Sequence, residues 1–174
     1  TDIVDKATRS KMMSSIKGKH TKPEMIVRRF LHAAGFRYRL HHKDLPGKPD
    51  LVLPKYNLVI FVHGCFWHQH QGCHYAYTPA SNSEKWKEKL EGNRQRGLIQ
   101  QQQLLEMGWR VLVIWECGLR HNSLMIDEIT QIITSSVQLT EWPAKPPRSS
   151  KVMQQEAIVA NDSALSPPIS FNQG

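Results

Sequence analysis

Two strongly apolar segments, separated by a long polar segment of helical character, restrict the folds open to this chain more than any other feature. Residues 58–62 and 109–115 are almost wholly apolar and have the length of buried strands. Residues 83–107 between them are polar; Ser83 can cap a helix and Gly108 can end it. A buried strand, a crossover helix and a second buried strand are typical of a parallel pair. We therefore expect an α/β fold in which the two apolar strands lie side by side.

Weaker signals surround this pair. Thr21 can cap a helix, Glu24 can complete a capping box with it, and Gly35 can end that helix. The other predicted elements are strands at 36–40 and 50–53, the second forming a hairpin with 58–62, and a last helix from Ser123 to about 137. The predicted order is α-β-β-β-α-β-α.

The net charge of the chain favours a polyanionic partner. Lysine and arginine outnumber aspartate and glutamate by 23 to 15, which gives a formal net charge of +8 at pH 7. Nucleic acid is the first candidate, although a basic protein without such a partner has a similar composition. No stretch approaches the roughly 20 apolar residues of a membrane helix. Residues 1–6 are polar, so we expect a soluble cytoplasmic protein that does not associate with membranes.

A group of cysteine and histidine residues predicts a zinc site. The chain has three cysteines, an odd number that fits poorly with a disulfide framework. Cys65, His70 and Cys73 lie within nine residues, in a segment that is too irregular for a regular element. Thiolate and imidazole ligands at such spacing suit tetrahedral zinc. The alternative is that the cysteines are small buried apolar residues.

The fourth zinc ligand must come from elsewhere. Cys117 lies just past the second apolar strand, and a parallel pairing would bring it to the edge of the sheet where the Cys65 loop begins. His68 and His74 are rival ligands. A site with four protein ligands leaves no position for a catalytic water, so we assign this zinc to structure.

Acidic and histidine residues near the first strand pair suggest a second kind of metal site. Asp50 stands at the start of one strand and His63 at the end of the next. Magnesium prefers oxygen ligands and could polarise a phosphate and activate a water there. Taken alone, Pro49-Asp50 indicates an ordinary turn. Glu24 has an equally simple interpretation as a capping residue.

Aromatic and basic residues offer a possible DNA surface. Phe66 and Trp67 lie on the histidine-rich loop, where they could enter a base stack or could cover the zinc site. Trp86 lies in the first turn of the long helix. The same helix carries five basic residues that could contact phosphates or simply be solvated: Lys85, Lys87, Lys89, Arg94 and Arg96.

Six motifs resemble one known family, the very-short-patch (Vsr) mismatch repair endonucleases of bacteria. The matching residues are Asp5 to Lys11, Leu45 to Asp50, Val59 to Phe61, His63 to His68, Gly108 to Leu112 and Trp115 to Cys117. The resemblance covers about residues 5–137. It implies a restriction-endonuclease-like mixed sheet flanked by helices, with a structural zinc site. It also implies a magnesium-dependent nick on the 5′ side of a thymine mispaired with guanine, the mismatch left by deamination of 5-methylcytosine.

The resemblance also implies roles for individual residues. Asp50 and the backbone carbonyl of Val62 would hold Mg²⁺, and Glu24, His63 and His68 would surround the metal and its waters, with His68 as general base or acid. The implied Zn²⁺ ligands are Cys65, His70, Cys73 and Cys117, and the implied DNA contacts are Phe66, Trp67, Trp86, Lys89, Asn93 and Arg96. Gly72 is an apparent insertion that leaves His74 open as a ligand. The chain lacks the active-site lysine of the wider superfamily, so histidines would take over its electrostatic role.

The expected organisation has three parts. These are an N-terminal DNA-contacting arm at 1–20, a nuclease domain at 21–142 and a polar, proline-containing tail at 143–174 that we expect to be disordered. The expected substrate is double-stranded DNA with a T:G mismatch, bound by a nucleoid-associated bacterial monomer, with other mismatch repair proteins as further partners. The competing hypotheses are a zinc-stabilised mismatch-binding module without catalysis and a zinc hydrolase of small molecules.

Overall fold

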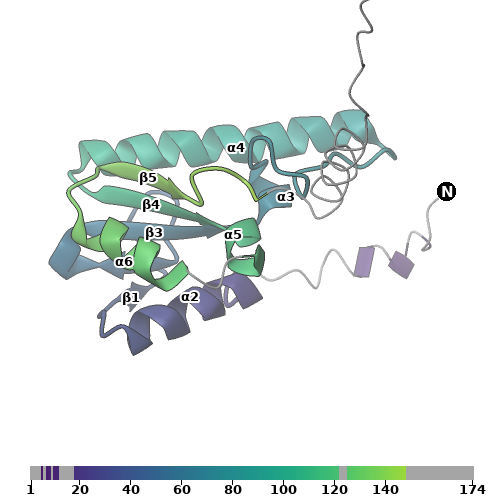
Figure 1. Cartoon of the computed structure of the whole chain (residues 1–174). Helices are drawn as coiled ribbons and strands as arrows, with labels where there is room; N and C mark the ends of the chain where they lie inside the picture. The colour runs from purple at the N-terminus through teal and green to yellow at the C-terminus, as the bar shows by residue number, and fades with distance from the viewer. Residues whose placement is uncertain (1–4, 6, 9, 12–17, 122–124, 148–174) are drawn as a thin grey trace, which may run out of the picture.

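A single mixed sheet with helices on both faces forms the body of the protein (Figure 1). The computed structural model describes residues 5, 7, 8, 10, 11, 18–121 and 125–147. From residue 18 onward, the helices are α2 (Lys22–Ala33), η1 (Pro54–Tyr56, a single 3₁₀ turn), α3 (Cys65–His68), α4 (Ser83–Glu106), α5 (Glu116–His121) and α6 (Met125–Thr134). The strands are β1 (Arg39–Leu40), β2 (Leu51–Leu53), β3 (Leu58–His63), β4 (Arg110–Trp115) and β5 (Leu139–Trp142).

The sheet has five strands in the order β1-β2-β3-β4-β5. The β1–β2 and β2–β3 pairs are antiparallel, and the β3–β4 and β4–β5 pairs are parallel. Leu58 pairs with Arg110 and His63 pairs with Trp115 across β3 and β4. The predicted hairpin, the predicted parallel pair and the mixed-sheet fold class are therefore confirmed.

Alternate residues of the central strands fill two separate cores. Leu58, Ile60 and Leu112 face α2 and α6, whereas Val59 and Val111 face the side of the sheet that α4 covers. Figure 1 shows α4 running along one face and α2 and α6 along the other. Because both faces are covered, β3 and β4 need apolar residues at almost every position, which explains their continuous apolar sequences.

The N-terminus of α2 agrees with its predicted cap, and that of α4 does not. The Thr21 side chain accepts a hydrogen bond from the Glu24 backbone N–H at 3.3 Å, as predicted for α2. Glu24 Oε2, however, accepts from the backbone N–H of His20 at 2.7 Å. The predicted cap of α4 is wrong: Ser83 is the first residue of the helix, and Asn82 precedes it with a left-handed φ of 54° and no side-chain cap bond.

Three elements were not predicted from the sequence. The first is α3, a single turn within the segment expected to be irregular, and the second is α5, which begins directly where β4 ends. The third is the edge strand β5, whose exposed Leu139 and polar interior residues give no apolar run. The predicted strand at 36–40 is reduced to Arg39–Leu40, since β1 pairs with only two residues of β2.

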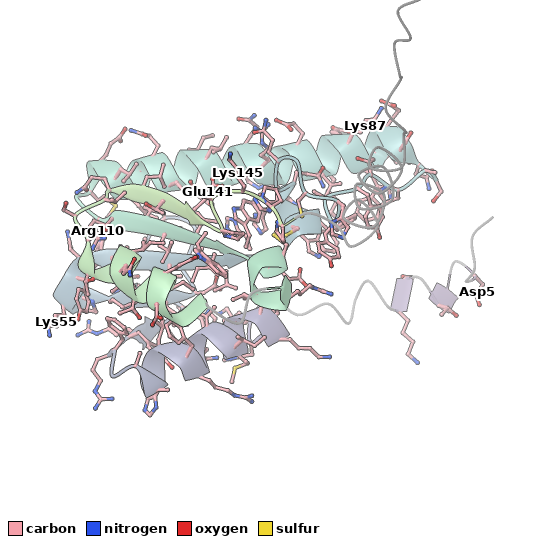
Figure 2. The ribbon with its side chains drawn as sticks, viewed as in Figure 1. Asp5, Lys55, Lys87, Arg110, Glu141 and Lys145 are labelled. Atoms are coloured by element: carbon pink, nitrogen blue, oxygen red, sulfur yellow. The ribbon has the colours of Figure 1, made fainter. Side chains whose placement is uncertain are left out.

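The buried guanidinium of Arg110 explains how α6 ends against the sheet. It donates hydrogen bonds to the backbone carbonyls of Ile132 at 2.8 Å, Ile133 at 3.0 Å and Val137 at 2.9 Å. Figure 2 shows Arg110 at the end of the sheet where β4 begins. A cation in this position satisfies carbonyls that a helix C-terminus leaves unpaired.

Close packing also fixes α5. A Cβ atom added at Gly118 would lie 2.5 Å from both the Trp142 ring and the Pro143 ring. Only glycine allows α5 to approach the end of β5 this closely, and α5 carries Cys117.

Some predictions fall outside the described residues. The predicted arm at 1–20 and tail at 143–174 are described only in part, so their boundaries stay predictions. Ser123, the predicted cap of the last helix, also lies outside the described ranges. Among the residues that are described, no helix has both the length and the apolar character needed to cross a membrane.

Candidate active site and metal centre

A cavity of about 1040 Å³ opens beside the end of β3 and extends along α4. On the sheet side, its lining includes four residues predicted for the magnesium site: Asp50, Val62, His63 and His68. On the α4 side, it includes the predicted DNA-contacting residues Lys89, Asn93 and Arg96. Glu24 does not line the cavity, but its neighbour His41 does. The structure thus brings most of the predicted catalytic and DNA-binding residues to one space.

The Asp50 carboxylate is held firmly next to β3. Its Oδ2 accepts a hydrogen bond from the backbone N–H of Val62 at 2.7 Å. Burial raises the pKa of Asp50 to about 6, and the nearby charge of Glu24 adds to this, whereas the Val62 hydrogen bond and Arg28 act against it. A bound cation would favour the ionised carboxylate. The buried carboxylate of Asp50 is therefore an oxygen ligand that suits a hard metal ion.

His63 and His68 form a stacked pair. Their ring centroids are 3.8 Å apart and the planes differ by 4°. Burial lowers the pKa of both imidazoles, and the interaction with His68 lowers that of His63 further. The Nδ1 atoms of both rings are buried without a hydrogen-bond partner in the part of the chain described. Both side chains are consequently neutral at pH 7.

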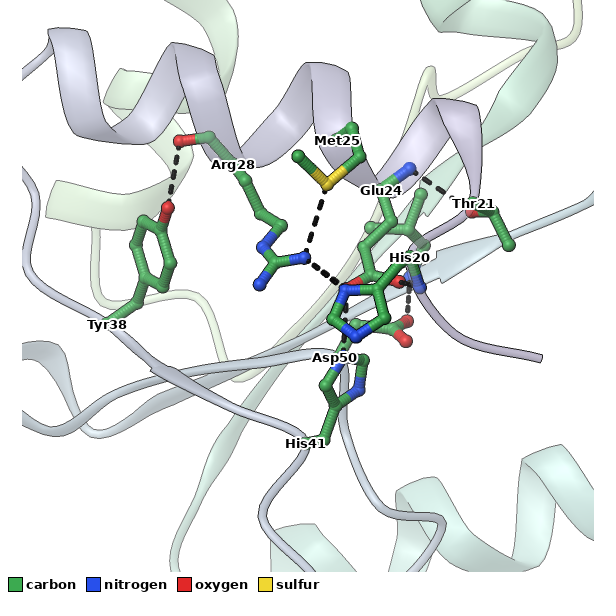
Figure 3. A network of polar contacts seen from close by, with 9 residues as sticks. His20, Thr21, Glu24, Met25, Arg28, Tyr38, His41 and Asp50 are labelled. Carbon is green, nitrogen blue, oxygen red and sulfur yellow. Dashed lines mark hydrogen bonds and ion pairs between the residues drawn. The ribbon is translucent and has the colours of Figure 1, made fainter. Parts of the chain in front are cut away.

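Glu24 belongs to a polar network at the first turn of α2 that sequence reasoning found only in part (Figure 3). Its Oε1 lies 3.1 Å from His41 Nε2 and 3.3 Å from Arg28 Nη1. His20 and His41 were not predicted as site residues. His20 lies only four residues before Glu24, a spacing that could have marked it, whereas only the fold brings His41 to the start of α2.

The four predicted zinc ligands converge in the structure. The ligand atoms of Cys65, His70, Cys73 and Cys117 all lie within 4.8 Å of one another, and all four residues are buried. His70 Nδ1 is 3.7 Å from Cys65 Sγ and 3.3 Å from Cys117 Sγ. Tetrahedral zinc with ordinary bond lengths has sulfur-to-nitrogen edges of about 3.5 Å. This buried site can therefore hold a metal ion.

The surroundings of the cluster favour metal binding. His68 and His74, the rival ligands, are not part of it. Hydrogen bonding, chiefly with Cys117, lowers the pKa of Cys65 to about 4 and raises that of Cys117, so one thiolate is already stabilised. The His70 ring stacks on Trp115 with centroids 4.1 Å apart and planes within 3°.

The predicted DNA-contacting aromatics form a cluster where α3 meets the first turns of α4. The Phe66 ring centroid lies 5.0 Å from that of Trp67, 5.6 Å from that of Trp86 and 5.3 Å from that of Tyr77. Tyr77 is 63% exposed and was not predicted. The apolar residues that pack against the cysteine core include Tyr75 but neither Phe66 nor Trp67, which speaks against the zinc-cover interpretation.

Basic residues on α4 fall into two groups. The Lys89 ammonium lies 5.6 Å from the Trp67 ring and 5.4 Å from the Trp86 ring. Asn93 donates to the Trp67 carbonyl at 3.2 Å and accepts from Arg96. By contrast, Lys87 points from α4 into solvent and pairs with Glu84 at 3.1 Å (Figure 2). Lys89 and Arg96 line the cavity and are called the cationic stripe of α4, whereas Lys87 does not line it.

Comparisons with known proteins place the chain among DNA mismatch endonucleases and nicking enzymes. The family model described as DNA mismatch endonuclease Vsr matches residues 1–74. The type II nicking enzyme V.XorIIP of Xanthomonas oryzae pv. oryzae is 47% identical over 119 residues, covering 68% of this chain and 87% of that protein. V.NmeAIP of Neisseria meningitidis is 41% identical, covering 76% and 94%. DNA mismatch endonuclease Vsr of Escherichia coli K12 is 41% identical, covering 81% and 86%.

Proposed function

This chain belongs to the Vsr family of DNA mismatch endonucleases, and from that membership we propose that it nicks DNA on the 5′ side of a thymine mispaired with guanine. Membership makes the protein a nuclease, and thus a hydrolase of phosphodiester bonds. The mismatch, the strand and the dependence on magnesium are parts of the proposal.

One observation supports the proposal most strongly: a single cavity joins the acidic and histidine residues to the cationic stripe of α4. Asp50, His63 and His68 line one side, and Lys89 and Arg96 line the other. A phosphodiester bound between them would meet positive charge along its backbone and a hydrolytic site at one point. The formal net charge of +8 supports the same class of substrate.

We assign magnesium to Asp50, together with the backbone carbonyl of Val62. Bound Mg²⁺ would supply positive charge for the phosphate and an activated water. Asp50 is oriented for this role by its hydrogen bond from Val62 N–H at 2.7 Å. With a pKa of about 6 the carboxylate is largely ionised at neutral pH, at an energetic cost that a bound cation would offset.

His68 serves as the general base or acid in this proposal. It is half-buried at the end of α3, whereas His63 is only 8% exposed within β3. A neutral imidazole can take a proton from a water and return it to the leaving oxygen. His63 then positions His68 through their stacked rings, which lie 3.8 Å apart. Glu24 does not line the cavity and would act on the metal indirectly, through waters near it.

Phe66, Trp67 and Trp86 would press into the base stack beside the mismatch. Aromatic side chains that enter between base pairs open the duplex locally, and a mispaired step resists this least. Two residues of α4 contact Trp67 in this cluster. Asn93 donates a hydrogen bond to the Trp67 carbonyl, and the Lys89 ammonium lies over the Trp67 ring.

Zinc at Cys65, His70, Cys73 and Cys117 would brace the aromatic loop. This site supplies four protein ligands and so has no free coordination position. The hypothesis of a small-molecule zinc hydrolase requires an open position and is therefore not supported.

Binding and cutting must be separable if the proposal holds. Asp50→Ala should bind a duplex with one T:G mismatch within a few-fold of the wild-type affinity but should not nick it in magnesium. His68→Ala should slow nicking by roughly 10²–10⁴-fold. A wild-type protein that binds the mismatch and never cuts it with any divalent metal would instead be a binding module.

A further inference from the structure

A second group of potential metal ligands lies at the start of α2, apart from the cysteine centre (Figure 3). It consists of His20, which precedes α2, Glu24 in its first turn and His41 in the loop after β1. One ligand atom from each of the three residues lies within 4.8 Å of the others. Segments far apart in the sequence therefore converge on one point.

Glu24 presents an unsatisfied oxygen to this point. The residue is only 1% exposed. Its Oε2 accepts a hydrogen bond from His20 N–H at 2.7 Å. Its Oε1 and the Nε2 of His41 face each other at 3.1 Å, yet both atoms are buried without a properly oriented hydrogen bond among the described residues. Buried polar atoms are rarely left this way in native proteins, and a missing ion is one explanation.

A protein cation already approaches the same point. Arg28 Nη1 lies 2.8 Å from His20 Nδ1 and 3.3 Å from Glu24 Oε1. The guanidinium thus supplies positive charge at the edge of the cluster. It does not satisfy Glu24 Oε1 with good hydrogen-bond geometry, so a smaller divalent ion could compete for the same atoms.

We propose that His20, Glu24 and His41 form a binding site for a divalent transition ion of the zinc and cobalt class. Two imidazoles with one carboxylate suit such ions, whereas magnesium prefers oxygen ligands and retains its waters. Three protein ligands leave room for at least one water, unlike the closed cysteine centre.

The site adjoins the proposed magnesium site and shares Glu24 with its surroundings, but the two histidine ligands are its own. The backbone N–H of His41 donates to the backbone carbonyl of Asp50 at 3.1 Å, and both residues line the same cavity. An ion held by the two histidines would place positive charge at the rim of this cavity. The inference goes beyond the proposed nicking activity and does not depend on it.

Cobalt provides a direct test on the full-length protein with its cysteine centre filled by zinc. We expect one further equivalent of Co²⁺ to bind, with weak visible d–d bands and without thiolate-to-cobalt charge transfer. His41→Gln should weaken this binding by at least about tenfold, since it removes a ligand. His42→Gln is the matched control, because His42 is adjacent in sequence but is outside the cluster. A large excess of Mg²⁺ should not displace the cobalt.

Other outcomes would overturn the proposal. They are the binding of no further cobalt, charge-transfer bands that place the ion on thiolates, or equal affinity in wild type and His41→Gln. Asp50→Asn must retain the extra equivalent; its loss would assign the cobalt to the magnesium site instead. If His41→Gln does not fold, His20→Gln gives the same comparison at an exposed position.

Discussion

Replacing Asp50 by asparagine removes a negative charge that destabilises the metal-free fold. Burial raises the pKa of Asp50 from 3.8 to about 6. Because one pKa unit corresponds to about 1.4 kcal/mol, ionising this group in the folded protein costs about 3 kcal/mol relative to the unfolded chain. Asparagine is neutral, has a similar shape and can still accept the hydrogen bond from Val62 N–H.

The pH dependence of this stability difference follows from the pH at which Asp50 loses its proton in the folded and in the unfolded chain. Below pH 3.8 the carboxyl is protonated in both the folded and the unfolded chain. As the pH rises towards 6, the unfolded chain loses its proton first, so the stability given by the raised pKa is progressively lost. Relative to wild type, Asp50→Asn should therefore gain about 1.5 kcal/mol at about pH 5 and about 3 kcal/mol at about pH 7.5.

Urea unfolding followed by tryptophan fluorescence, with zinc retained and no added magnesium, measures this difference. Millimolar magnesium should stabilise wild type but not Asp50→Asn, since a ligand stabilises only the state that binds it. Asp44→Asn is the control, because the Asp44 side chain is 92% exposed. An Asp50→Asn advantage that does not grow between the two pH values would show that burial does not destabilise the ionised Asp50 carboxylate.

Three further predictions concern the metal centre, the DNA surface and α5. Cys117→Ser should lower bound zinc below one equivalent per chain in elemental analysis, and full retention would contradict the four-ligand assignment. Lys89→Ala should reduce the slope of log affinity for DNA against log salt by about 0.9, as expected for one lost phosphate contact, whereas Lys87→Ala should leave it unchanged. Gly118→Ala should destabilise the fold by about 1–3 kcal/mol in thermal unfolding, because the added methyl group has no space. Gly97→Ala, where an added Cβ meets nothing within 4 Å, should be neutral or stabilising.

Long, regular signals in the sequence predicted the centre of the fold. The apolar runs that became β3 and β4 and the polar run that became α4 are each continuous, and their order implied a parallel crossover. That pairing also placed Cys117 beside Cys65 and His70, which lie far from it in the sequence. The prediction of the zinc cluster therefore depended on the prediction of the sheet.

Short elements and contacts made only by the fold could not be predicted. β5 has four residues with an exposed Leu139, so its place in the sheet comes from pairing with β4 and not from its own pattern. The approach of His41 to Glu24 depends on how the loop after β1 meets α2. No spacing rule connects His41 to Glu24, because the loop conformation sets their distance.

Mapping the nick on a duplex with both strands end-labelled shows whether the protein cuts at the mismatch and which strand it cuts. The substrates are a duplex with a single T:G mismatch and the same duplex with T:A in its place, each incubated in magnesium. We predict one nick, in the thymine strand of the mismatched duplex and at the phosphodiester on the 5′ side of that thymine. Equal cutting of the T:A duplex, cutting of the guanine strand, or full activity of Asp50→Ala would contradict it.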